Sequence, residues 1–256
     1  RYGLPVRRRG RCGIDVAAVA KTLVVKNIGY LYVIQLLRLC LPLALLSMLT
    51  KVLTETQYSV YVYALASSAW LSIFIEYGFN ISATRRIAAS GEPANTWAVV
   101  TETQSAKWML AVLSLVFLAW ALTRSTVFSP YPEWAIGAWL LGVIIGLTPT
   151  YYFQAISSLG PMALLEVMGG LITFCCVLFV RSSADFNLLC AVLVGVRFLI
   201  WQILERSMFK KGKVRYRDVL AIRPGLSALK DGWRIFLVQA AASLYTSFNV
   251  VLLGAV

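Results

Sequence analysis

The stretch YSVYVYALASSAWLSIFIEYGFNISA, residues 58–83, decides the fold of this chain. Its first eighteen residues, 58–75, contain no charged side chain. Crossing the hydrocarbon core of a bilayer takes roughly 20 apolar residues in a helix. The stretch is therefore predicted to be a transmembrane helix that carries polar groups, beginning with Glu76, at one end.

Similar apolar runs recur along the 256 residues, of which 59% are hydrophobic and only 14% charged. Soluble domains carry about a quarter charged residues, so the composition predicts an all-α polytopic membrane protein. The predicted helices cover 30–50, 58–83, 108–122 (extended backward by a weaker stretch, 97–106), 133–154, 162–180 and 187–204, and a seventh begins at 233.

These runs give a predicted domain organisation. Residues 1–29 form a basic N-terminal segment, 30–205 contain six transmembrane helices, 206–232 form a basic loop, and 233–256 begin a seventh helix. Because the last run stops at Val256, we expect the chain to be truncated within that helix.

The distribution of Lys and Arg predicts the orientation. The net charge is +13, and most basic residues lie in 1–29, near 85–107 and in 206–232, which fall on one side if the helices alternate. The other side receives only Lys51, Arg124 and Arg181. Cytoplasmic loops are enriched in Lys and Arg, so we expect a cytoplasmic N-terminus and a bacterial inner-membrane location. The same asymmetry accounts for the high net positive charge, because basic residues on the cytoplasmic side can contact anionic membrane lipids. It therefore argues against nucleic acid as a partner.

Residue types argue against metal and cofactor chemistry. Histidine is absent, and four of the five cysteines lie within apolar runs without a CxxC pair, which is typical of small packing residues. We therefore expect no metal, no cofactor and no catalytic residue.

Charged groups inside the apolar runs are the informative signal, since each costs about 2.5–3.5 kcal/mol at the centre of a bilayer helix. Arg197 lies near the middle of its run, which indicates either a water-filled pathway or a structural ion pair. Arg38 follows Gln35 by three residues, and Pro42 removes the helical hydrogen bond to the Arg38 carbonyl. This group indicates a kinked helix lining a transport site; a side chain reaching the cytoplasmic interface is the alternative.

The polar end of the opening stretch continues as EYGFNISATRR, residues 76–86. Glu76, Asn80 and Thr84 recur at helical spacing and share one face, while Arg85 and Arg86 follow at the cytoplasmic end. A carboxylate within an apolar span needs a cation, and Arg38 on the preceding helix is the partner we consider.

Several segments resemble one transporter family. YGFNISATRRIA (77–88) is similar to the helix-two signature of polysaccharide transporters, the Wzx-type O-antigen and exopolysaccharide repeat-unit flippases of the MATE-like MOP superfamily. Residues 32–61 resemble their helix-one opening without its two glycines, and LTPTYYFQAISSLG (147–160) resembles the end of helix four without its Trp, Gly and Glu. SLYTSFNVVLLG (243–254) resembles the start of helix seven.

The resemblance implies the N-terminal half of a two-lobe transporter with a central cationic cavity. Its expected activity is moving undecaprenyl-pyrophosphate-linked oligosaccharide repeat units across the inner membrane for O-antigen, capsule or exopolysaccharide synthesis. Polymerase and export proteins of a polysaccharide assembly system are the implied partners. Arginines bind phosphate oxygens through charge-assisted bonds, so the expected substrate-binding residues are Arg38, Arg197, Arg85, Arg86, Asn80, Gln35, Tyr245 and Asn249, with Glu76 and Pro42 in structural or coupling roles.

Three alternatives remain. A MATE-like multidrug or cation exporter would need acidic residues, and only Glu76 and Glu166 lie within spans. A membrane enzyme would need paired carboxylates or a large polar loop, which the sequence lacks. A truncated inactive remnant, or an assembly part for another half, is the third.

Overall fold

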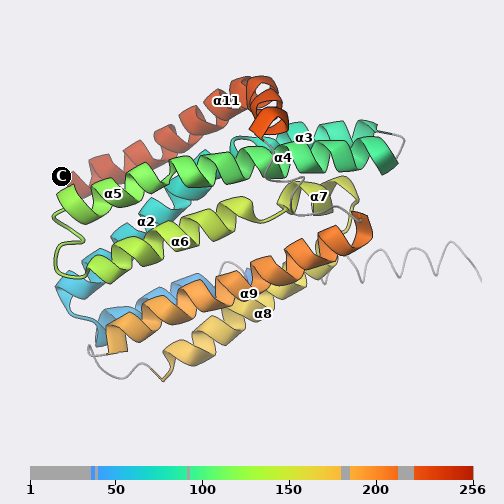
Figure 1. The fold of residues 1–256 in the computed structure, drawn as a ribbon. Coiled ribbons are helices and arrows are strands. Elements are labelled where there is room, and N and C mark those ends of the chain that lie inside the picture. The colour runs from blue at the N-terminus through green and yellow to red at the C-terminus, as the bar shows by residue number, and fades with distance from the viewer. Residues whose placement is uncertain (1–35, 38–39, 91–92, 180–184, 213–221, 256) are drawn as a thin grey trace, which may run out of the picture.

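The computed structural model describes residues 36–37, 40–90, 93–179, 185–212 and 222–255, and these are almost entirely helical. Figure 1 shows long helices lying side by side along one direction. Five apolar segments are long enough to cross a membrane, and a shorter apolar helix, Cys40–Val52, precedes them; the five are Glu55–Ala89, Ala94–Arg124, Pro132–Ala155, Leu159–Val177 and Phe186–Lys210. The chain is an all-α polytopic membrane protein, as predicted.

The second predicted span is divided into α2 (Glu55–Glu76) and α3 (Phe79–Ala89). A capping box formed by Thr54 and Gln57 starts α2, which satisfies backbone N–H groups that have no helical partner. Tyr77 and Gly78 both adopt left-handed backbone conformations (φ 47° and 74°) between the two helices. The sequence predicted one continuous helix here, and this pair of left-handed residues breaks it.

The third and fourth spans are also divided. The third consists of α4 (Pro93–Leu113) and α5 (Leu115–Arg124), and the fourth of α6 (Pro132–Leu147) and α7 (Thr150–Ala155). Pro149 lies between α6 and α7, where proline cannot donate a helical hydrogen bond and keeps the preceding residue out of the α conformation.

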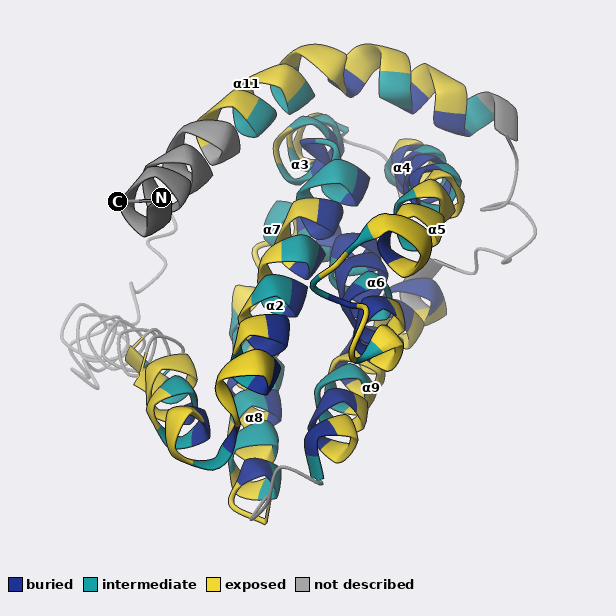
Figure 2. Cartoon of the chain, turned by 90° about the vertical axis from the view of Figure 1, so that its left-hand side faces the viewer, coloured by how far each residue is buried: buried dark blue, intermediate teal, exposed yellow. Residues whose placement is uncertain are grey.

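The bundle packs through small residues and leaves apolar side chains outside. Helix α2 lies along α6, and a Cβ added to Gly142 of α6 would be only 2.6 Å from the Leu71 Cβ of α2. Helix α9 (Phe186–Gly212) packs against α6 and α8 (Leu159–Val177). The outward faces are largely exposed (Figure 2), and they carry large apolar residues such as Val116, Ile172 and Leu199. Such faces suit lipid contact rather than water.

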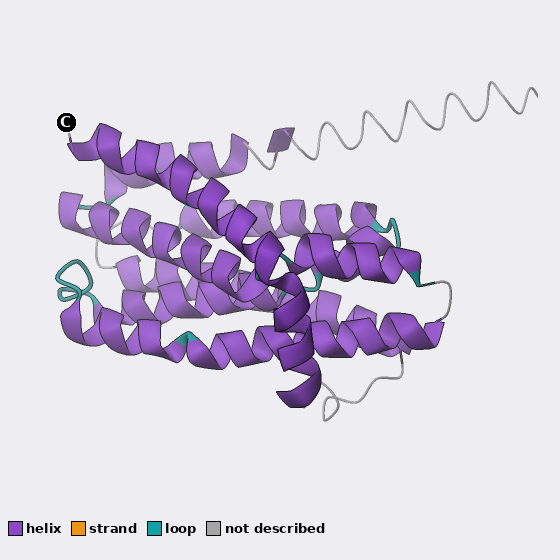
Figure 3. Ribbon diagram, turned by 90° about the horizontal axis from the view of Figure 1, so that it is seen from above, coloured by secondary structure: helices purple, strands orange, loops and turns teal. Residues whose placement is uncertain are grey.

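The predicted loop 206–232 is shorter in the structure, because α9 continues to Gly212 and α11 (Ile222–Ala255) begins at Ile222. Figure 3 shows α11 crossing the other helices obliquely. Its contact with α4 is close: a Cβ added to Gly225 would be 2.8 Å from the Met109 sulfur. Ala228 is buried one turn later. Packing of these small residues on α4 explains why the segment is helical although its sequence is basic.

Candidate substrate cavity and polar junction

Two of the helix breaks, α2–α3 and α6–α7, lie beside each other. Helix α3 packs against α7, and the Thr84 hydroxyl donates a hydrogen bond of 3.0 Å to the carbonyl oxygen of Tyr151. A backbone carbonyl in the first turn of α7 is thereby held by a side chain of α3. We call the residues around both breaks the polar junction: Glu76, Asn80, Thr84, Lys107, Thr148 and Tyr151.

Lys107 of α4 is the cation of the polar junction. Its side chain is 0% exposed, and its Nζ donates a hydrogen bond of 3.0 Å to the carbonyl oxygen of Thr148, at the end of α6. The same Nζ lies 5.0 Å from the centre of the Tyr151 ring, within the range of a cation–π interaction. Lys107 thus joins α4 to the broken end of α6 and to α7.

Glu76 faces this lysine. The Lys107 charge acts on the Glu76 carboxylate, and the Asn80 side chain is its hydrogen-bond partner. The other polar atom of Asn80, Oδ1, is buried without a partner. The sequence led us to consider Arg38 as the cation for Glu76; Arg38 lies outside the described residues, and the structure supplies Lys107.

Lys107 is the residue that sequence reasoning missed, because it was counted with the basic residues of a cytoplasmic connection. A signal was present in TETQSAKW, residues 101–108. Gln104 and Lys107 lie three residues apart, and such residues share a helix face. Both side chains are fully buried, and neither polar atom of Gln104 has a hydrogen-bond partner.

A cavity of about 230 Å³ lies between the helix Cys40–Val52, α2, α6, α8 and α9. Among the described residues two charged side chains line it, Arg197 of α9 and Glu166 of α8, and Pro42, Tyr61 and Ser68 also contribute. The rest of the lining is mostly aliphatic. Such a hollow can receive a molecule that combines an apolar part with an anionic group.

The predicted site residues therefore lie in three places. Arg197 and Pro42 share the cavity, whereas Glu76 and Asn80 belong to the polar junction and do not line it. Arg85 is exposed on α3. Gln35 and Arg38 lie outside the described residues, as do the side chains of Tyr245 and Asn249, whose backbone belongs to α11.

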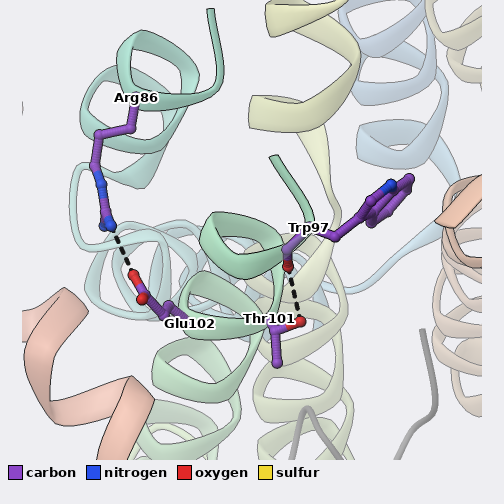
Figure 4. A network of polar contacts seen from close by, with 4 residues as sticks. All are labelled: Arg86, Trp97, Thr101 and Glu102. Atoms are coloured by element: carbon purple, nitrogen blue, oxygen red, sulfur yellow. Dashed lines mark hydrogen bonds and ion pairs between the residues drawn. The ribbon is translucent and has the colours of Figure 1, made fainter. Parts of the chain in front are cut away.

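Arg86 is held by a neighbouring helix. Its Nη2 lies 2.7 Å from Oε2 of Glu102 on α4, and both side chains are partly exposed. Figure 4 shows this pair beside the Thr101 hydroxyl, which bonds the carbonyl oxygen of Trp97 in its own helix. The C-terminal ends of α3 and α9 lie at the same end of the bundle (Figure 1), so the basic residues Arg85, Arg86 and Lys210 gather there.

The described residues form a multi-pass helical bundle with divided helices and a hollow lined in part by Arg197, which defines a polytopic membrane protein. Comparison with known sequences gives the family: residues 24–256 match the family described as "Polysaccharide biosynthesis protein", and the chain belongs to it. The family resemblance found in the sequence is thereby confirmed.

Two curated relatives carry the description "Putative O-antigen transporter". The protein from Escherichia coli (strain K12) is 25% identical over 242 residues, which cover 90% of this chain and 55% of the relative. The protein from Shigella dysenteriae is 26% identical over 238 residues, covering 90% of this chain and 58% of the relative. The chain thus spans a little over half the length of these relatives. No solved structure matches.

Proposed function

We propose that the chain is part of a membrane transporter, not an enzyme, that moves an undecaprenyl-pyrophosphate-linked oligosaccharide across the bacterial inner membrane. The observation that carries this proposal is the family match over residues 24–256, together with two relatives described as O-antigen transporters. The product would serve O-antigen, capsule or exopolysaccharide synthesis. Polymerase and export proteins of the same assembly system are the proposed partners.

The barrier to such transport is the anionic headgroup, because unpaired charge in apolar surroundings is costly. Arg197 lines the cavity and is the residue proposed to bind the diphosphate, since a guanidinium can form two parallel bonds to phosphate oxygens. The aliphatic lining beside it suits the first carbons of the lipid chain. Arg38, which precedes the cavity-lining Pro42 by four residues in the sequence, is proposed as a second phosphate ligand.

Entry is proposed at the basic end of the bundle. Arg85 is exposed there and Arg86 is anchored by Glu102, so the pair can attract an anionic headgroup before it reaches the cavity. Gln35, Asn80, Tyr245 and Asn249 are proposed to contact sugar hydroxyls or to orient the arginines. This end is proposed to be cytoplasmic, with the N-terminus on the same side.

Alternating access is proposed to use two lobes. Residues 30–205 would form the first lobe, between the basic segments 1–29 and 206–232, and residues 233–256 would begin the second. The relatives are nearly twice as long as the region they share with this chain, which leaves room for that second lobe. Broken helices such as α2–α3 and α6–α7 line substrate sites in many transporters.

Complementation tests the proposal. The protein is expressed in a strain that lacks its O-antigen transporter but makes the lipid-linked unit, and surface O-antigen is measured on gels of lipopolysaccharide. We expect wild type to restore O-antigen and the Arg197→Glu variant to lose it. Arg124→Glu is the matched control, because Arg124 is exposed at the end of α5, away from the cavity. Equal restoration by both variants would reject the role of Arg197.

A MATE-like exporter of organic cations is the second candidate, and Glu166 favours it because this carboxylate lines the same cavity. Resistance of the expressing strain to cationic drugs distinguishes the two. Drug resistance that disappears in Glu166→Gln, without any restored O-antigen, would replace the flippase assignment.

A further inference from the structure

Glu205 of α9 is a buried carboxylate that the proposed transport mechanism does not use. Its side chain is only 3% exposed. In the described part of the chain it forms no hydrogen bond or ion pair. The residues that precede and follow it by one turn, Trp201 and Phe209, are buried apolar residues. The Glu205 side chain is therefore largely buried between apolar neighbours on its own helix face.

Two hydrogen-bond donors near Glu205 also lack partners. The charge of the Glu205 carboxylate acts on the Tyr151 hydroxyl, which is buried on α7 without a hydrogen bond. Trp201 lies four residues before Glu205 and so on the same helix face, and its Nε1 is likewise buried without a partner. The Trp201 ring also contacts the ring of Trp108 on α4, with the two ring centroids 6.3 Å apart.

The charges of the interior do not balance if both carboxylates are ionised. Lys107 faces Glu76 and donates a hydrogen bond to the Thr148 carbonyl. Its single positive charge therefore balances the negative charge of Glu76. Among the described side chains, Glu205 would add a second negative charge without an ion-pair partner. An ionised carboxylate in an apolar interior is very costly without a partner, and the neutral acid avoids that cost.

The surrounding chemistry favours a proton over a metal ion as the ligand. The Trp201 indole N–H donates hydrogen bonds and offers no lone pair to a metal ion, and the Lys107 ammonium, which would repel a metal ion, lies over the Tyr151 ring. A proton on Glu205 needs neither additional ligands nor space.

We propose that Glu205 is a proton-binding residue that holds its proton in the conformation described here, and that it loses this proton to water when α7 separates from α9. The site couples a proton to the position of the broken helix α6–α7. Its use in transport rests on the proposed function, whereas the proton site itself does not.

The elements around Glu205 carry other ionisable groups. Helix α7 contributes Tyr151 and Tyr152, and α4 contributes Lys107, whose ammonium lies over the Tyr151 ring. Helix α6 carries only Glu133, in its first turn at the opposite end, and on α8 Glu166 lines the cavity with Arg197. On α9 itself, Arg206 and Lys210 are exposed. Within the described part of the chain none of these cations forms an ion pair with Glu205, and in our proposal a proton is the neutralising group.

Infrared spectroscopy of the purified protein tests this proposal directly. A protonated carboxylic acid has a carbonyl stretching band that an ionised carboxylate lacks. We expect such a band at neutral pH in wild type, its loss in Glu205→Gln, and its retention in the control Glu133→Gln, which changes an exposed glutamate of α6. A wild-type spectrum without the band, or a band that survives Glu205→Gln, would overturn the proposal.

A second measurement covers a variant that is too unstable for spectroscopy. If the native state holds one proton more than the unfolded chain, the stability of wild type falls as pH rises. The melting temperature of wild type and of Glu133→Gln is therefore expected to drop between about pH 5 and pH 8, relative to Glu205→Gln or Glu205→Leu. Parallel pH profiles in all variants would reject the proton site. Neither readout involves the transported molecule, so its failure is distinct from a failure to complement.

Discussion

The two ends of α6 are stabilised in opposite ways. Near its first turn an aromatic cluster, Tyr61, Phe128, Trp134 and Phe186, is buried almost completely, with Trp134 stacked on Phe186 at 4.3 Å. At its last residues the polar junction gathers Glu76, Lys107 and the freed Thr148 carbonyl. The stability of the aromatic cluster depends on close packing of its rings. The stability of the polar junction depends on the pairing of its charges and hydrogen-bonding groups. Of the two ends, the polar junction is the one that contains the oppositely charged residues Glu76 and Lys107.

The largest expected effect is at Lys107. Lys107→Met leaves the Glu76 carboxylate buried without its cation, and breaking a buried pair in this way costs about 3–5 kcal/mol. Thermal unfolding in detergent measures the loss. Lys51→Met is the control, because Lys51 is exposed. The double variant Glu76→Gln/Lys107→Met is expected to recover much of the stability, and a double variant as unstable as Lys107→Met would show that the charges are not coupled.

A loss of similar size at the aromatic cluster should have no such rescue. Trp134→Ala removes a ring that is 1% exposed, and truncation of a buried aromatic costs about 3–5 kcal/mol. Trp134→Phe is expected to cost less than about 1.5 kcal/mol, because the Trp134 Nε1 has no hydrogen bond to lose. If Trp134→Phe were as unstable as Trp134→Ala, a polar role of the indole would be established.

A third prediction concerns the close contact between α2 and α6, which lies between the two ends of α6. Gly142→Ala places a Cβ 2.6 Å from the Leu71 Cβ and 2.9 Å from the Ser68 carbonyl oxygen. Overpacking of this kind costs about 1–3 kcal/mol. Gly195→Ala is the matched control in α9, where nothing lies within 4 Å of the added atom; it should be neutral or slightly stabilising. Unchanged unfolding of Gly142→Ala would contradict the close approach.

A smaller effect is expected for the bond between the two broken helices. Thr84→Val removes the hydroxyl that bonds the Tyr151 carbonyl at 3.0 Å, which should cost about 0.5–1.5 kcal/mol. Thr101→Val is the control, since the Thr101 hydroxyl bonds only the Trp97 carbonyl of its own helix. Equal melting temperatures for both variants would mean that this link contributes nothing.

The smallest effect belongs to the Arg86–Glu102 pair at the surface. Both side chains are partly exposed, at 38% and 27%, and exposed ion pairs contribute less than about 1 kcal/mol. Arg86→Gln should lower stability by no more than this, and the loss should shrink further at high salt. A large loss of stability that salt does not reduce would contradict this prediction and show that the Arg86–Glu102 pair acts as a buried ion pair.

The sequence by itself determined the membrane fold and the family. Long runs without charge specify transmembrane helices wherever they occur, because crossing a bilayer depends on local composition and length. The signature at residues 77–88 likewise identified the family before any contact was known. Arg197 could be predicted as a cavity residue because a charge near the middle of an apolar run requires polar surroundings.

Only the tertiary structure decided how the polar groups combine. Whether Glu76 meets Arg38 or Lys107 depends on which helices are neighbours, and residue spacing within one helix does not contain that information. The break at Tyr77–Gly78 and the approach of α3 to α7 were equally hidden, since each is stabilised by contacts between residues far apart in the chain, such as Thr84 with Tyr151. The proton proposed for Glu205 follows from the same physics: a buried carboxylate is identified by its surroundings, and those come from other helices.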